Sequence, residues 1–148
     1  MTLTDDAAPV LVVRRVMAVP RERVFAAWLD SESLARWMCP PNRTHATVTV
    51  DPRVGGRFRI VMEGPADGKD YEHRGEYLAI EPPSLLSFTW ISRGTDYQPT
   101  VVTIELHEQG TGTDLVLTHR RLPPKAIEGH RSGWTDIVRL LDEVLTRG

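Results

Sequence analysis

The chain has 148 residues, of which 41% are hydrophobic and 26% are charged, a profile typical of one soluble globular domain. A chain of this length forms a core without needing disulfides or a structural metal. The formal net charge is −2, and the 18 basic and 20 acidic residues are interspersed along the chain. This distribution argues against a nucleic-acid-binding protein, so we expect no nucleic acid among its partners.

The single cysteine, Cys39, excludes an internal disulfide and a multi-cysteine zinc site. The histidines show no spacing typical of metal ligands, so we expect no metal and no other cofactor. The polar N-terminus lacks the features of a signal peptide, and no apolar run reaches the ~20 residues that span a bilayer. We therefore expect a flexible tail over residues 1–9, one domain over 10–148, a cytoplasmic location and no stable membrane association.

The first elements are predicted to be a strand and two short helices. Residues 10–19 are mostly β-branched and apolar, which indicates a strand. Residues 21–30 follow a proline suited to the first turn of a helix, and their apolar side chains fall on one helical stripe. Ser31 is a candidate N-cap for a second short helix that ends before Pro40.

A series of strands follows, each with apolar side chains on one face and polar side chains on the other. In one of them Phe58, Ile60 and Met62 share a face, while Arg57 and Arg59 lie on the opposite face. Glycine- and proline-rich turns separate the strands, and one of these turns is a hairpin loop at 64–68. The predicted strands are 45–51, 57–63, 71–80, 85–91, 101–107 and a last strand around 115–119.

The C-terminal segment predicts one long helix. A pair of prolines at 123 and 124 opens it, and Ile127, Trp134 and Leu141 recur at regular intervals on its apolar stripe. About 24 residues at 1.5 Å each extend about 36 Å, roughly the diameter of a domain. Because a wide antiparallel sheet must twist and curl, we expect an α+β fold. In it a curved sheet of about six to seven strands wraps around the long helix, with the two short helices between the first and second strands.

A curved sheet around one helix leaves space between them, and such a space is a natural ligand cavity. The side chains expected to line it lie on the inner faces of the predicted elements: Trp28, Trp37, Phe58, Ile60, Met62, His73, Tyr77, Phe88, Trp90, Ile104, Leu117, His119, Trp134 and Val138. The aromatic members equally fit a packed core. Tyr77, His73 and His119 are the candidates for polar contacts that orient a ligand. Since no carboxylate falls clearly on an inner face, no residue is assigned a catalytic role.

Two pairs of glycines stand out. Gly55 and Gly56 precede a strand, so they fit a turn with positive φ better than a phosphate-binding loop, which a helix would follow. Gly129 and Gly133 lie one turn apart in the long helix, where each costs ~1 kcal/mol relative to alanine. Two explanations stay open for this second pair. It allows close packing on a strand, or it forms a soft spot that lets the helix shift as a ligand enters.

Several local patterns occur in an order typical of one superfamily. They include Gly55-Gly56-Arg57-Phe58, Gly75-Glu76-Tyr77 followed by Ile80-Glu81-Pro82-Pro83, and the segment HRSGW from His130 to Trp134. With these patterns, residues 10–146 resemble the START-like, helix-grip (SRPBCC) superfamily, and within it the bacterial branch related to the activator of heat-shock protein 90 ATPase. The resemblance implies the helix-grip fold and a cavity for an apolar small molecule.

Three functions follow from these observations. We expect the protein to bind a small apolar or amphipathic molecule, such as a lipid, in the internal cavity. The first alternative is a cyclase- or hydratase-like enzyme that uses the same cavity. The second is a co-chaperone or stress-response protein whose partner is a chaperone. A homodimer formed through the outer face of the sheet or an edge strand also stays open.

Overall fold

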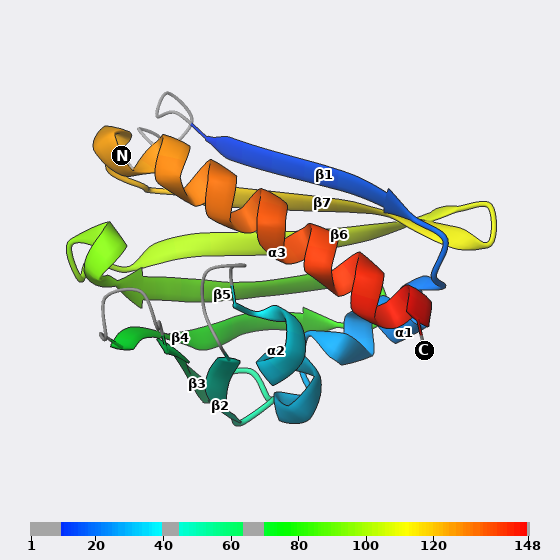
Figure 1. Ribbon diagram of the computed structural model, residues 1–148, viewed down its shortest axis with the longest axis horizontal. Coiled ribbons are helices and arrows are strands. Elements are labelled where there is room, and N and C mark those ends of the chain that lie inside the picture. Colours follow the sequence, from blue (N-terminus) through cyan, green and yellow to red (C-terminus); the bar gives the residue numbers. More distant parts are fainter. Residues whose placement is uncertain (1–9, 40–44, 64–69, 148) are drawn as a thin grey trace.

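The computed structural model describes residues 10–39, 45–63 and 70–147. The predicted tail over residues 1–9, the hairpin loop at 64–68 and the helix stop at Pro40 lie outside these ranges. The described chain forms one sheet covered on one face by helices, as Figure 1 shows. Within these ranges, no helix is long and apolar enough to cross a membrane.

The sheet has seven strands in the order β1-β7-β6-β5-β4-β3-β2. Every neighbouring pair is antiparallel, which confirms the predicted curved antiparallel sheet. The first two strands of the chain lie at opposite edges, and the two short helices connect them. The strands are β1 (Leu11–Met17), β2 (His45–Val50), β3 (Arg57–Glu63), β4 (Asp70–Glu81), β5 (Leu85–Ser92), β6 (Thr100–Gln109) and β7 (Gly112–Arg120).

The two short helices are α1 (Arg21–Ala27) and α2 (Ser31–Trp37). The N-cap of α2 is Asp30, one residue earlier than predicted, because the Asp30 carboxylate accepts a hydrogen bond of 3.0 Å from the backbone N–H of Ser33. This correction moves the cap from Ser31 to a residue whose backbone is extended and whose side chain is a charged acceptor.

The long helix α3 (Ile127–Arg147) has 21 residues. A 3-10 turn, η3 (Pro124–Ala126), precedes it, so the segment predicted as one helix begins with a tighter turn. A second 3-10 turn, η2 (Arg93–Thr95), links β5 to β6. In Figure 1, α3 crosses the face of the sheet obliquely, with η3 at one end and α1 near the other.

Glycines allow close backbone approach at one point in the sheet and in one turn between strands. A Cβ on Gly75 would lie 1.9 Å from the Thr89 carbonyl oxygen and 2.7 Å from the ring of Phe58. Gly55 has a φ of 85°, and a Cβ on Gly56 would lie 2.1 Å from the Asp51 carbonyl oxygen. The first glycine pair therefore has the predicted turn role.

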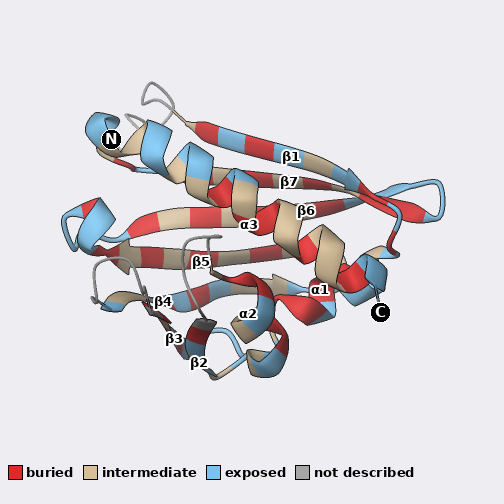
Figure 2. Ribbon diagram, in the orientation of Figure 1, coloured by how far each residue is buried: buried red, intermediate tan, exposed pale blue. Residues whose placement is uncertain are grey.

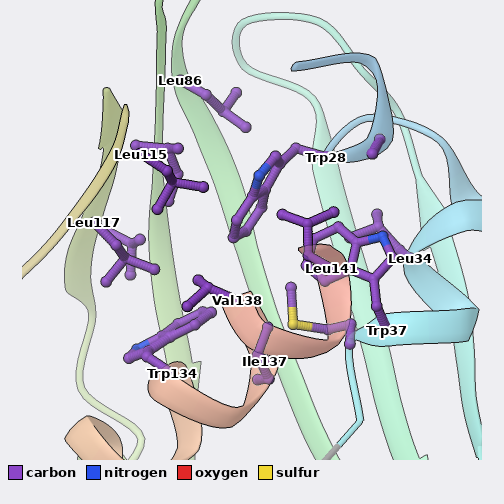
Figure 3. Close-up of a cluster of buried hydrophobic side chains, with 14 of the residues drawn as sticks. Trp28, Leu34, Trp37, Leu86, Leu115, Leu117, Trp134, Ile137, Val138 and Leu141 are labelled. Carbon is purple, nitrogen blue, oxygen red and sulfur yellow. The ribbon is translucent and has the colours of Figure 1, made fainter. Parts of the chain in front are cut away.

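Side chains from α1, α2, α3 and the sheet fill the centre of the interior. In Figure 2 the buried positions alternate along the strands and follow the sheet-facing side of α3. Trp28 lies at the centre of this core, with ring centroids 4.7 Å from Trp37, 6.3 Å from Phe88 and 6.5 Å from Trp134. Figure 3 shows Trp28, Trp37 and Trp134 with Leu141 between α3, the short helices and the strands. The middle of the sheet–helix interface is thus solid.

Candidate functional site

The open space lies at one end of the interior, where α3 begins. It is a hollow of about 710 Å³ that opens to solvent, and we call it the end hollow. Its lining comes from the ends of β3, β4 and β5, from η2 and the residues around it, from η3 and from the first turns of α3. A volume of this size holds a drug-sized molecule.

Aromatic rings form the apolar wall of the end hollow. The rings of Trp90 and Trp134 lie 4.9 Å apart at 52°, and the His73 imidazole lies 4.9 Å from Trp90 at 33°. Met62 and Ile137 extend the same wall. Trp90 and Trp134 are only 3% and 2% exposed, so their rings are held in place by their neighbours and border the end hollow with a small part of their surface.

The rim of the end hollow is polar and charged. Arg93, Asp96 and Lys125 lie there, and the Lys125 Nζ is 3.2 Å from an Asp96 carboxylate oxygen. Both members of this pair are exposed, so it contributes little to stability. The rim therefore combines with the aromatic wall to give an amphipathic site.

A chain of buried hydrogen bonds fixes the wall from behind. The Trp134 indole N–H donates to Nδ1 of His119 over 3.0 Å, so Nδ1 is the unprotonated nitrogen. Nε2 then carries the proton and donates to Oγ1 of Thr100 over 2.7 Å, and the Thr100 hydroxyl donates to the Trp90 carbonyl over 2.6 Å. Each polar atom in this series of hydrogen bonds has a partner, and the first and last members of the series, Trp134 and Trp90, are residues of the wall.

His119 is held in its neutral form by this environment. Burial, and in second place the charge of nearby His130, lower its pKa from 6.5 to about 3. At 1% exposure it lies behind Trp134 and does not border the end hollow. Its position is that of a satisfied core histidine that supports the wall.

His130 does border the end hollow. Its Nδ1 lies 2.9 Å from the Ala126 carbonyl oxygen one helical turn earlier. Burial lowers the pKa of His130, and the hydrogen bond to Ala126 opposes part of this shift. The ring lies against η2, where a Cβ on Gly94 would come within 3.1 Å of its Cε1 atom. The absence of a side chain at Gly94 thus makes room for this imidazole.

Gly129 and Gly133 also border the end hollow. A Cβ at either position would meet no atom within 4 Å. The suggestion that these glycines allow close packing on a strand is therefore wrong, because no strand lies against them. The two glycines instead leave the wall of the end hollow without side chains along one turn of α3.

A second, inner void of about 10 Å³ lies deeper, among the aromatic side chains of the core. Tyr77 borders it, and burial together with the negative charge of Asp51 raises the pKa of this phenol to about 12. The indole N–H groups of Trp28 and Trp90 also belong to residues on this void, and neither has a hydrogen-bond partner among the described residues. The void is too small for any ligand larger than a water molecule.

The structure distributes the fourteen residues predicted as cavity lining over three places. Four of them border the end hollow: Met62, His73, Trp90 and Trp134. Trp90 also borders the inner void, together with Trp28, Phe58, Ile60, Tyr77 and Phe88. The other five border neither space and lie in the packed core: Trp37, Ile104, Leu117, His119 and Val138.

Sequence reasoning missed His130 and the residues of η2 as parts of a site. Their signal was present in the helix, where Gly129, Gly133 and Ile137 recur at intervals of one turn on a single stripe. When no other element packs against them, small residues on an otherwise apolar stripe indicate an open space beside the helix and not a close contact with a neighbouring element. The end of the interior at which that space lies depends on side chains far apart in the sequence.

Metal binding and nucleophilic chemistry at Cys39 find no support within the described ranges. No group of three or more His, Cys, Asp or Glu side chains there is arranged to hold a metal ion. Burial raises the pKa of the Cys39 thiol, which favours the neutral thiol over the nucleophilic thiolate.

The family of the chain follows from comparison with known proteins. The profile of a family described as "Activator of Hsp90 ATPase homolog 1-like protein" matches residues 18–146. The chain belongs to this AHSA1 family. A search of curated proteins found no match.

Solved structures agree with the AHSA1 fold. Protein CV1439 from Chromobacterium violaceum is 26% identical with a TM-score of 0.82, over 92% of this chain and 96% of that one. Protein NE0264 from Nitrosomonas europaea is 25% identical with a TM-score of 0.79, over 93% and 94%. Protein MLL2253 from Mesorhizobium loti is 27% identical with a TM-score of 0.76, over 94% and 98%. The helix-grip architecture of this chain is therefore shared by solved structures from several bacteria.

Proposed function

We propose that the protein binds a small amphipathic molecule in the end hollow. The observation that carries this proposal is an open space of about 710 Å³ with an aromatic wall on one side and a polar rim on the other. The apolar part of the ligand packs on Trp90 and Trp134, and its polar part lies toward His73, His130 and the charged rim. The solid centre of the interface supports binding at this end rather than along the whole length of α3.

Desolvation supplies most of the affinity in such a site. At ~25 cal/mol per Å² of apolar surface removed from water, a ligand that buries ~300 Å² gains ~7 kcal/mol before the costs of ordering. The wall contributes with little loss of freedom, because its aromatic rings are already fixed. The polar rim then sets the orientation of the ligand rather than its affinity.

The test is to fill the end hollow without disturbing the fold. Gly133→Leu places a side chain into the open space beside Trp134, and Ser132→Leu adds the same side chain on the exposed face of α3. With anilinonaphthalene sulfonate as a fluorescent amphipathic probe, we expect Gly133→Leu to weaken binding at least about tenfold. The matched Ser132→Leu control should bind like the unaltered protein. Equal affinities in all three proteins would contradict the proposal.

The same pair of variants separates ligand binding from a chaperone-directed activity. The description of the family refers to an activator of the Hsp90 ATPase. Activation of a chaperone would depend on an outer surface of this protein. Gly133→Leu would leave stimulation of a bacterial Hsp90 ATPase unchanged in that case. Ligand binding through the end hollow predicts instead that a small molecule retained during purification is lost from Gly133→Leu, as native mass spectrometry would show.

A further inference from the structure

The protonation pattern of His130 is set by its own helix. The Ala126 carbonyl oxygen can only accept a hydrogen bond, so Nδ1 of His130, 2.9 Å away, carries the proton. In a neutral imidazole Nε2 is then an acceptor with a free lone pair. No described protein group hydrogen-bonds Nε2, and the residue borders the end hollow.

The position of this acceptor is fixed from two sides. The ring of His130 meets the ring of buried His119 edge to face at 5.2 Å and 86°. On the other side it lies against the backbone of η2 at Gly94. The His119 ring is neutral and hydrogen-bonded through both nitrogens, so it presents no proton to His130. Nε2 lies on the side of the ring that faces Gly94, 3.6 Å from the Cβ position of that residue, and both residues border the end hollow, so the partner to consider for this nitrogen is a donor in that space.

The other charged groups of the end hollow are placed differently. Lys125 and Asp96 are paired with each other at the exposed rim, and Arg93 belongs to the same rim. The aromatic wall of Trp90 and Trp134 lies deeper. His130 is half-buried, so its depth in the end hollow lies between that of the buried wall and that of the exposed rim.

We infer that His130 determines specificity by accepting a hydrogen bond from a hydroxyl or N–H group on the ligand. This inference rests on the proposed function and adds a chemical class to it: an apolar ring or chain that carries a donor, such as a phenol or an alcohol. The corresponding ether fills the same space but leaves Nε2 without its partner. One neutral hydrogen bond corresponds to a preference of about three- to tenfold for the donor.

The experiment compares naphthol with its methyl ether, which differ in the donor and little in shape. Binding is followed by nuclear magnetic resonance through the indole N–H signals of Trp90 and Trp134. The unaltered protein should bind naphthol about three- to tenfold more tightly than the ether. In His130→Leu, which keeps a helix-forming residue of similar size, the two probes should bind equally. The control His107→Leu, at an exposed position on β6, should retain the preference.

The outcomes distinguish failure of the inference about His130 from failure of the proposed ligand binding. If both probes bind the unaltered protein equally, or if His130→Leu still prefers naphthol, the inference is overturned while ligand binding stands. If neither probe binds, the proposed function fails and the inference fails with it. A thermal melt of His130→Leu shows whether the variant is folded. If His130→Leu is not folded, His130→Gln replaces it. In that case the imidazole nitrogen signals of the unaltered protein are also followed as naphthol is added. The inference is overturned if His130→Gln keeps the preference for naphthol and these imidazole signals do not change.

Discussion

At the scale of single residues, one hydroxyl joins two distant parts of the core. Thr100 is fully buried and accepts from His119 while it donates to the Trp90 carbonyl. Inside a protein an unpartnered polar group costs far more than a made hydrogen bond contributes. The arrangement therefore depends on this hydroxyl, since without it both His119 and the Trp90 carbonyl lose a partner.

Thr100→Val tests this dependence, because it removes the hydroxyl and keeps the shape. We expect the free energy of unfolding to fall by about 1–3 kcal/mol, the usual cost of leaving a buried polar group unpaired. Urea denaturation measures the change. Thr118→Val, on the neighbouring strand and only partly buried, is the control and should shift stability by no more than about 0.5 kcal/mol. Equal changes in the two variants would show that the hydroxyl at 100 is dispensable.

At the scale of elements, α3 gives up stability in its first turns. Gly129 and Gly133 both lack positive φ angles, so the helix does not need glycine for its backbone geometry. Glycine in a helix interior loses more conformational entropy on folding than alanine does. What the two glycines provide is room beside Trp134. The soft-spot explanation for this pair stays a prediction.

Replacing both glycines with alanine should stabilise the protein by ~2 kcal/mol, from ~1 kcal/mol at each position. The added methyl groups meet no atom within 4 Å, so no clash offsets the gain. Urea denaturation again measures it. Gly75→Ala is the opposite control, because its Cβ would lie 1.9 Å from the Thr89 carbonyl oxygen, and it should destabilise. Under the soft-spot explanation the alanine pair also slows probe uptake, which stopped-flow fluorescence measures.

At the scale of the whole molecule, acid sensitivity follows from buried histidine more than from ion pairs. Most of the ion pairs among the described residues involve exposed side chains, for example Arg53 with Asp51 and Lys125 with Asp96, and such pairs contribute little. His119 is different, because its folded pKa of about 3 lies well below its ordinary value of 6.5. Burial lowers the pKa of His130 in the same direction.

We expect stability to fall as the pH is lowered from 6.5 toward 3. In this window the unfolded state binds a proton at His119 that the folded state does not, so acid favours unfolding. The loss from His119 alone is roughly 2 kcal/mol by about pH 5. Denaturation at several pH values, compared between the unaltered protein and His119→Gln, isolates this contribution. A variant as acid-sensitive as the unaltered protein would rule out His119 as the source.

The architecture could be predicted from the sequence because its signals are local. Alternation in β3 and β5 and the apolar stripe of α3 each need only a few neighbouring residues. The site needs more. Thr100 meets His119 only because β5, β6 and β7 pair in the register Trp90↔Thr100 and Val102↔His119. Long-range pairings of this kind decide how the large aromatic rings pack in the interior and which end of it stays open. No local sequence pattern predicts them.

The placement of the first strand has a consequence for biosynthesis. β1 pairs with β7, the last strand of the sheet, over its whole length. When only the N-terminal half of the chain has left the ribosome, β1 therefore has no strand with which to pair. Folding dominated by contacts so distant in sequence is slow, and an unpaired strand attracts other chains in the meantime. Emergence of β7 ends that exposed period, because β7 pairs with β1 along its whole length.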